Sequence, residues 1–359
     1  MNGGKTMTGT SVYKRKDGRW EARIYSYDGN RSYRSFYGDT KEAAMRKRQA
    51  AAYCYSDEIT EISVRDLCRE WLQIIANRVK PSTLANYRMK AEKHIIPAFG
   101  GSLCHEISTK AVYDFINSKI DSGLSARYVS DITVLLKSLF KYAKKAYNIP
   151  SPSDGIVVPK PARSEVRLLT AQEQEKLKSY IGMNCSLISL GIVLANGMGL
   201  RIGEVCGLKW SDIDLEKRIL TVRRTVQRVA VHDGINRTIV MIMSPKSKTS
   251  ARDIPIPEGV FAMLSKCETA PDNYVLSGCD SPVEPRKMQY HFAKILKNAN
   301  LPSVRFHSLR HAFASKAVEV GFDIKTLSEI LGHSKVELTM NLYVHSNMDR
   351  KRSCMALMK

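Results

Sequence analysis

A proline-dense stretch at residues 148–165 divides this chain of 359 residues into separate parts. Its sequence, NIPSPSDGIVVPKPARSE, holds four of the thirteen prolines. Proline lacks the amide hydrogen that a helix needs and fixes its own backbone, so the stretch cannot continue a helix and favours an extended, semi-stiff path. We therefore predict an interdomain linker at residues 151–165, between a domain at 59–150 and another at 166–359.

Residues 11–37 predict a small sheet at the start of the chain. Asp17-Gly18 and Asp28-Gly29 each separate runs of Tyr, Trp, Arg and Ile, and such Asp-Gly pairs are a strong hairpin signal. We expect a three-stranded meander and a helix over residues 40–52, together a domain of residues 1–58. One sheet face would read a nucleic-acid groove while the other packs on the helix. The alternative is a basic surface that only faces solvent. The residues expected to bind are Lys14, Arg15, Arg23, Arg31 and Arg34.

Residues 60–147 predict a bundle of four helices. Apolar side chains from Val64 to Ile75 recur at the spacing of one helical face, behind Ser63 as a cap. Pro81 suits the first turn of a second helix, and two further apolar patterns mark a third and a fourth. Lysines gather at the end of the fourth helix. A lysine-rich helix end is often simply solvated, but here we expect contact with a polyanion through Lys141 and Lys144.

The net charge of +21 supports a polyanionic partner. It is spread as +5 over residues 1–59, +6 over 60–160 and +10 over 161–359, so an extended polyanion fits better than one small acidic ligand. The apolar runs are too short to span a membrane, and the polar N-terminus lacks the core of a signal peptide. The eight cysteines never fall two to four apart, which argues against a zinc site and fits a reducing, cytoplasmic location.

Residues 166–359 combine helices with one small sheet and hold two arginine motifs. In GLRIGE, Arg201 lies between apolar neighbours and can pair with Glu204 one helical turn later. In HSLRH, His307 and Arg310 share the face of a helix start, which suits an oxyanion or a phosphate. We expect a strand from Ile219 to Val229 between these motifs. The alternative for Arg201 is a purely structural ion pair.

Two lysines, a further histidine and a tyrosine complete the candidate set. SPKSKTSARDIPIP places Lys246 and Lys248 on a turn, where lysines usually face solvent. In LGHS, Gly332 is expected to cap one helix and His333 follows it. Tyr343 falls on the next helix, where a packed aromatic is the ordinary alternative.

These residue types together predict phosphoryl transfer. Two arginines can stabilise the charge that a phosphodiester gains under attack, without a metal. A tyrosine nucleophile would form a covalent phosphotyrosine that conserves the bond energy for religation. His307 and His333 lie 26 residues apart with no cysteine or carboxylate at ligand spacing between them, so no metal is expected. We expect no cofactor, and neither ATP nor a divalent ion is required.

On these motifs, in this order and spacing, most of residues 60–359 resembles the tyrosine recombinase family, also called the phage integrase family. The resemblance implies a mainly helical, multidomain fold with small β-sheets: an N-terminal three-stranded sheet plus helix, a SAM-like core-binding bundle and a mixed α+β catalytic domain. It implies that Arg201 and Arg310 hold the scissile phosphate. His307 would be a general acid/base or hydrogen-bond partner, and His333 a further donor.

The resemblance also implies the chemistry of the two remaining groups. Tyr343 would attack, giving a 3′-phosphotyrosyl DNA intermediate and a free 5′-hydroxyl. Lys246 would protonate the leaving 5′-oxygen, because the family commonly places this lysine about nine residues before the proline that ends the strand, here Pro255; Lys248 is the competitor.

The meander is similar to the arm-binding domains of integrases from temperate phages and conjugative transposons, especially those of Gram-positive bacteria. The leading hypothesis is therefore a site-specific recombinase that integrates and excises a mobile element. Its expected partners are double-stranded DNA at core and arm sites, three further copies in a homotetramer, an excisionase and a host DNA-bending protein, in the bacterial nucleoid. The alternatives are a Xer-like chromosome-dimer resolvase, a type IB topoisomerase-like enzyme, or a non-catalytic DNA-binding regulator, which would need a missing motif residue.

Overall fold

The computed structural model describes residues 12–27, 31–53, 61–160, 167–231, 238–244 and 251–333, and the single positions 336, 337, 340, 352, 355 and 356. Among the predicted site residues, Lys246, Lys248 and Tyr343 lie outside the described residues, as do the side chains of Arg31 and Arg34. The chain divides into two compact units. One comprises Met1–Gln73 with Lys90–Pro161, and the other Ile74–Met89 with Ala162–Lys359.

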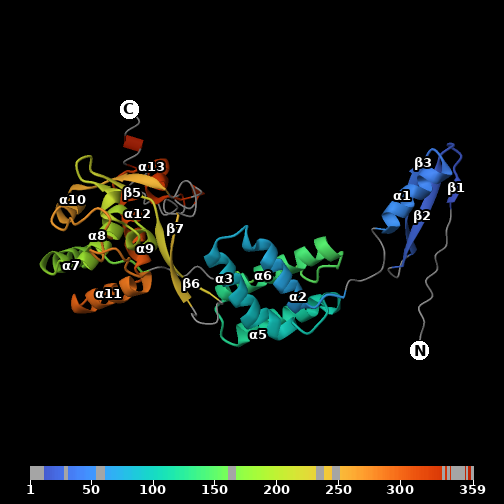
Figure 1. Ribbon diagram of the computed structural model, residues 1–359, viewed down its shortest axis with the longest axis horizontal. Helices are drawn as coiled ribbons and strands as arrows, with labels where there is room; N and C mark the ends of the chain where they lie inside the picture. The colour runs from blue at the N-terminus through green and yellow to red at the C-terminus, as the bar shows by residue number, and fades with distance from the viewer. Residues whose placement is uncertain are drawn as a thin grey trace. The chain divides into compact units, whose positions relative to one another are not determined.

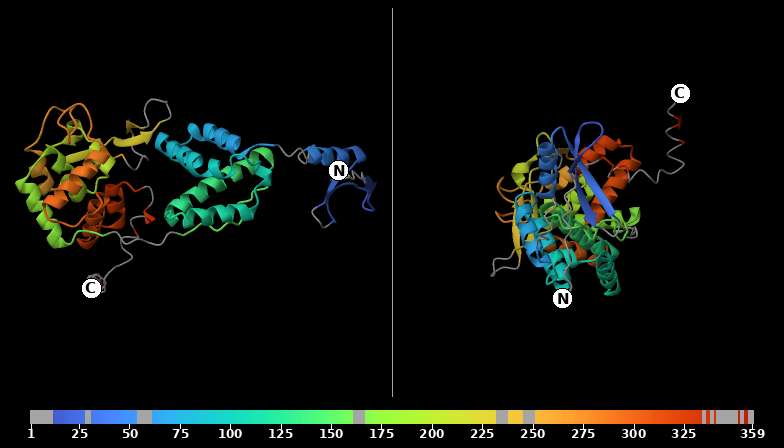
Figure 2. Two further views of the ribbon diagram at one scale, coloured as in Figure 1. Left: turned by 90° about the horizontal axis from the view of Figure 1, so that it is seen from below. Right: turned by 90° about the vertical axis from the view of Figure 1, so that its right-hand side faces the viewer.

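The predicted N-terminal meander is confirmed. Strands β1 (Val12–Lys14), β2 (Trp20–Tyr27) and β3 (Arg31–Gly38) form an antiparallel sheet in the order β1-β2-β3. Helix α1 (Lys41–Tyr53) packs across this sheet (Figure 2). The Thr40 hydroxyl accepts a hydrogen bond from the Ala43 amide at 3.1 Å and so caps the helix. Gly18, in the first Asp-Gly pair, has a φ of 86°, which the turn requires and which glycine adopts without strain.

The four predicted helices that follow the meander are also present. They are α2 (Val64–Ala76), α3 (Pro81–Lys90), α5 (Thr109–Asp121) and α6 (Ala126–Tyr147). The third predicted helix, α5, is preceded by a π-helical turn, Ala91–Ile95, the short helix α4 (Ile96–Phe99) and a 3-10 turn, Cys104–Glu106. Within the first unit, Leu67, Ile95, Ile132 and Leu136 are completely buried. Ser63 caps α2 as predicted, because its hydroxyl accepts from the Asp66 amide at 3.1 Å.

The proline-dense stretch packs against the bundle over its first half. Ile149 and Ile156 are 2% and 3% exposed, and the Lys137 ammonium donates to the Ile156 carbonyl at 3.0 Å. Two apolar side chains thus hold this part of the expected linker on α6 and its neighbours, because burying them is more favourable than an extended path through water. Residues 161–166 lie outside the described residues.

The second unit is built around helix α8 (Leu187–Met198), in which Leu190, Leu194 and Met198 are at most 1% exposed. Figure 1 shows α8 among the helices that pack on it. The helices of this unit, besides α3, are α7 (Ala171–Met183), α9 (Ile202–Cys206), α10 (Glu258–Leu264), α11 (Pro285–Asn298), α12 (His307–Glu319) and α13 (Ile324–Leu331), with a 3-10 turn at Trp210–Asp212. No helix in the described ranges is long and apolar enough to cross a membrane.

The prediction of a single strand from Ile219 to Val229 is wrong, because this segment forms two strands that belong to different sheets. β5 (Ile219–Val222) pairs with β4 (Ile213–Asp214) and β8 (Arg252–Pro255), whereas β6 (Thr225–Ala230) pairs with β7 (Thr238–Met243). The break falls at Arg224, whose guanidinium donates to the buried Asp212 carboxylate at 2.6 Å. A charge-assisted bond of this kind favours the turn over a continued strand.

Candidate active site

Three arginines meet at the C-terminal end of α13. Arg252 donates through Nε to the Ile330 carbonyl at 2.5 Å, Arg310 through Nη2 to the Leu331 carbonyl at 2.7 Å, and Arg201 through Nη2 to the Gly332 carbonyl at 2.8 Å. The last carbonyls of a helix lack partners within the helix and carry the negative end of its dipole. Cations are therefore stabilised at this end, and three consecutive carbonyls each receive one.

A single buried carboxylate, Glu204, is shared by two of these arginines. Arg201 Nη1 donates to Glu204 Oε1 at 2.8 Å, while Arg252 Nη1 and Nη2 donate to Oε1 and Oε2 at 3.1 and 2.9 Å. Burial opposes ionisation of Glu204, but the hydrogen bonds from Arg252 and the charges of Arg252 and Arg201 outweigh it and lower its pKa. Three guanidinium groups and one carboxylate leave the cluster positively charged.

Arg310 is the most deeply buried of the predicted phosphate ligands, at 4% exposed. Its second described bond runs from Nη1 to the Gly199 carbonyl at 2.7 Å. Burial, and next the charge of Arg201, lower the pKa of Arg310 to about 9, so the group stays charged at neutral pH. A buried cation held by neutral carbonyls gains strongly from an anion placed beside it.

Two histidines lie beside the arginines and are neutral at pH 7. His307 begins α12 and His333 follows α13. Loss of surrounding water is the main cause that lowers the pKa of each to about 4. The charges of His311 and Arg310 add to it for His307, and those of Arg310 and Arg201 for His333. His307 is exposed as a residue, and its ring centre lies 4.8 Å from that of His311 in an edge-to-face arrangement. A neutral imidazole can accept a proton or donate a hydrogen bond.

Two glycines end the helices whose last carbonyls the arginines bind. Gly199 ends α8 and Gly332 ends α13, with φ of 69° and 61°. A Cβ at Gly199 would lie 2.6 Å from Phe313, and one at Gly332 would lie 2.9 Å from Arg252 Nη1. Both positions therefore require glycine for conformation and for space, as the predicted cap at Gly332 implies.

The structure brings Arg201, His307, Arg310 and His333 together, since the two arginines bind neighbouring carbonyls and, besides burial, their charges lower the pKa of both histidines. Their roles, and those of Lys246, Lys248 and Tyr343, stay predictions. Sequence reasoning missed Arg252, although a signal was present. In the strand RDIPIP, alternation puts residue 252 on the same face as Ile254 and Ile256, which are 2% and 5% exposed. An arginine in register with two core residues is expected to need a buried anionic partner.

The N-terminal sheet carries a second group of charged residues, centred on Glu21. This carboxylate is 2% exposed and accepts from Ser35 Oγ at 2.5 Å, from Arg23 Nε at 2.7 Å and from Arg15 Nη1 at 3.3 Å. The Ser35 bond, followed by the Arg23 bond, lowers the pKa of Glu21 to about 2. The Arg23 guanidinium lies 4.1 Å from the ring centre of Tyr33.

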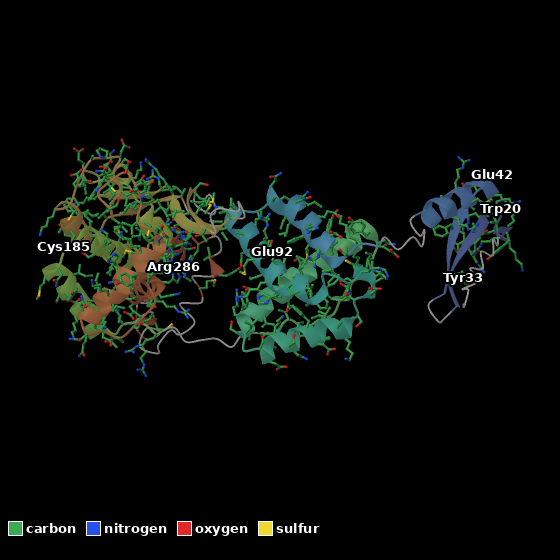
Figure 3. All side chains as sticks on the ribbon, turned by 60° about the horizontal axis from the view of Figure 1, so that its bottom comes forward. Trp20, Tyr33, Glu42, Glu92, Cys185 and Arg286 are labelled. Atoms are coloured by element: carbon green, nitrogen blue, oxygen red, sulfur yellow. The ribbon has the colours of Figure 1, made fainter. Side chains whose placement is uncertain are left out.

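The strand register sorts the described basic residues of this sheet by face. Lys14 pairs with Trp20, and alternation puts both on the opposite face from Glu21, Arg23 and Tyr33 (Figure 3, where Trp20 and Tyr33 are labelled). Arg15 and Arg23 therefore share the face with Tyr33, whereas Lys14 does not.

The two lysines predicted to bind DNA from α6 are both exposed. Lys144 forms a 2.8 Å ion pair with Asp154, while Lys141 is exposed at the same end of the helix.

A positively charged, partly buried site with two histidines is suited to binding an anion such as a phosphate ester. Comparison with known proteins places it in a family. Residues 165–350 match the phage integrase family, and residues 63–120 match the phage integrase N-terminal SAM-like domain. The chain therefore belongs to the phage integrase family and is a tyrosine recombinase, a site-specific DNA recombinase.

Relatives and solved structures agree with this assignment. The chain is 28% identical over 345 residues to a XerC-like tyrosine recombinase of Caldanaerobacter subterraneus subsp. tengcongensis, covering 87% of this chain and 88% of that protein. It is 26% identical over 284 residues to the ICEBs1 integrase of Bacillus subtilis, covering 74% of each. The Tn1549 transposon integrase, solved with a circular intermediate DNA, shares the fold with a TM-score of 0.69 at 22% identity, covering 83% of this chain and all of that one. A lambda integrase tetramer on a Holliday junction gives 0.57 at 21%, covering 90% and 95%.

Proposed function

We propose that this recombinase integrates and excises a mobile element, cutting one DNA strand at a time with Tyr343 as the nucleophile. The observation that carries the proposal is the convergence of Arg201 and Arg310 on one positively charged site beside His307 and His333. A phosphodiester is the anion that such a site favours, and a strand-exchange enzyme needs its charge stabilised without hydrolysis.

The chemical step transfers one phosphodiester linkage to the protein. The Tyr343 hydroxyl attacks phosphorus and gives up its proton, a 3′-phosphotyrosyl bond forms, and the bond to the 5′-oxygen breaks. Neutral His307 accepts or relays the tyrosine proton, and Lys246, or its competitor Lys248, donates a proton to the leaving oxygen. Attack by the 5′-hydroxyl of a second strand reverses these steps and releases the tyrosine.

The two arginines play unequal parts in binding the phosphate. The Arg201 side chain is 35% exposed, while Arg310 is almost completely buried. The bound phosphate therefore contacts the exposed part of Arg201, and Arg310 stabilises the same oxygens from the protein interior. Both guanidinium groups are already held by carbonyls, so little reorganisation accompanies the rise in charge at the transition state.

The assembly follows from the charge distribution and the relatives. We propose that residues 1–58 read arm sites, that 59–150 and 166–359 bind the core site from two sides with 151–165 joining them, and that four copies assemble on DNA as lambda integrase does in its Holliday-junction complex. An excisionase, a host DNA-bending protein and a nucleoid location in the bacterial cytoplasm belong to the same proposal.

The deciding experiment is a cleavage assay. A nicked core-site duplex, taken from the ends of the element that encodes the chain, traps the covalent adduct, and the single-turnover rate of adduct formation is measured. Tyr343→Phe removes only the attacking hydroxyl, so it is expected to abolish the adduct while leaving the Kd for the duplex unchanged. An adduct that persists in this variant would refute the assignment. Activity in EDTA is expected to equal that without it.

A further inference from the structure

Arg252 is the one arginine of this three-arginine cluster that the sequence motifs did not identify as a site residue. It is the first residue of β8, and its side chain is only 6% exposed. All three of its guanidinium nitrogens are engaged with protein groups: Nε with the Ile330 carbonyl, and Nη1 and Nη2 with the two oxygens of Glu204. Arg310 is also buried but has described bonds from only two of its nitrogens. Because Arg252 already donates to protein groups from all three, we expect it to influence DNA chemistry through the residues that it holds.

We propose that Arg252 is a positioning residue of the active site. It keeps Glu204 from neutralising Arg201, and it fixes the last turn of α13, which precedes His333. The inference rests on the proposed role of Arg201 as a phosphate ligand. It makes Arg252 necessary for the rate of cleavage but not for the affinity for DNA.

The first half of this role is electrostatic. Glu204 is 4% exposed and must be paired, because an isolated buried carboxylate is costly. Arg252 satisfies both of its oxygens in the two-pronged geometry that guanidinium and carboxylate prefer. Arg201 contributes a single side-chain bond to Oε1 and keeps part of its surface open. Without Arg252, the full charge of Glu204 would act on Arg201 and weaken the stabilisation that Arg201 gives to the charge developing on the phosphate at the transition state.

The second half is mechanical. The bond from Arg252 Nε reaches the Ile330 carbonyl, in the turn that precedes Gly332 and His333. Gly332 leaves just enough room for this guanidinium, since a Cβ there would lie 2.9 Å from Nη1 and 3.2 Å from Cζ. A lysine carries a point charge without a planar fork, so it can pair with Glu204 but cannot also hold the carbonyl in the same geometry.

Four variants in the full-length chain test the role: Arg252→Met, Arg252→Lys, Glu204→Gln and the double variant Arg252→Met/Glu204→Gln. In the cleavage assay, Arg252→Met is expected to slow adduct formation by about 100-fold, with Arg252→Lys intermediate, and both with a Kd within about twofold of wild type. Multiplying the fold-losses of the two single variants gives the rate expected of the double variant if the two residues act independently. The measured rate of the double variant is expected to exceed that value by at least about tenfold, because removing the Glu204 carboxylate removes the charge that acts on Arg201.

The matched control is Arg224→Met. Arg224 also pairs with a buried carboxylate, Asp212, but its described partners are Asp212 and the Gly207 carbonyl rather than α13. The Arg224→Met variant is expected to have a lower free energy of unfolding, while its folded fraction cleaves at the wild-type rate. Circular dichroism verifies that each assayed variant is folded, and Arg252→Lys carries the test should Arg252→Met fail to fold.

Three results would overturn the inference: a wild-type rate in Arg252→Lys, strictly multiplicative effects in the double variant, or a Kd that rises in parallel with the loss of rate, which would mean direct contact with DNA. Failure of the proposed function is distinct, because it would appear as an adduct in Tyr343→Phe.

Discussion

Arg310 donates to the Leu331 carbonyl at 2.7 Å, which ties a predicted phosphate ligand on α12 to the last residue of α13. The same guanidinium reaches the Gly199 carbonyl at the end of α8. One side chain thus joins the C-terminal ends of two helices, where unpaired carbonyls concentrate negative charge. The cost of burying Arg310 is offset by backbone groups, and its charge stays available to an anion.

Arg310→Lys is expected to lower the cleavage rate by about 100- to 1,000-fold, because an ammonium group cannot hold two carbonyls and a phosphate in one plane. The measurement is the single-turnover rate, with binding of the same duplex recorded alongside. Arg286→Lys, at an exposed arginine of α11 (labelled in Figure 3), is the control and should behave as wild type. Equal rates for the two variants would contradict a phosphate role for Arg310.

The lowered pKa values of His307 and His333, both about 4, predict a pH dependence of stability. A free histidine titrates near 6.5, so between about pH 6.5 and 4 the unfolded chain binds more protons than the folded one. The free energy of unfolding therefore rises with pH through this window. The stability that depends on neutral His307 and His333 is fully present above about pH 6.5.

Titration of the two imidazoles by NMR checks this assignment directly. His307→Gln and His333→Gln identify the signals, and each variant should flatten part of the acid-side slope in urea unfolding measured from pH 4 to 7. Imidazole pKa values at or above 6.5 in the folded protein would show that neither burial nor the arginine charges act on these rings as the geometry implies.

Local patterns in the sequence sufficed for much of the fold. Ser63 and Thr40 cap their helices as predicted because a cap depends on residues three positions apart. Arg252 could not be assigned in the same way, since its partners Glu204 and Ile330 lie 48 and 78 residues away. The break at Arg224 was missed for the same reason, as Asp212 is twelve residues earlier and becomes buried only in the folded unit.

Gly332→Ala is expected to lose both stability and activity. Its φ of 61° is unfavourable for alanine, and the added Cβ would press on Arg252, so we expect a loss of about 1–3 kcal/mol in the free energy of unfolding. Gly321→Ala is the matched control, because Gly321 has a φ of 96° but nothing within 4 Å of the added Cβ. Urea unfolding should show losses in both variants, whereas cleavage should slow only in Gly332→Ala. Slower cleavage in both would assign the effect to backbone strain alone.

Arg23→Ala separates an integrase with an arm-binding domain from a Xer-like resolvase. Arg23 is fixed by Glu21 and lies over the Tyr33 ring on the sheet face away from the Trp20 side, so its loss removes a cation from the surface proposed to meet arm DNA. Binding to an arm-site duplex should weaken, and the slope of log K against log salt concentration should decrease by about 1. Recombination of full attachment sites should fall in parallel, while the cleavage rate on the core-site duplex serves as the internal control and should not change. Unaltered recombination of full sites would favour the resolvase function, because that activity does not require an arm-site contact.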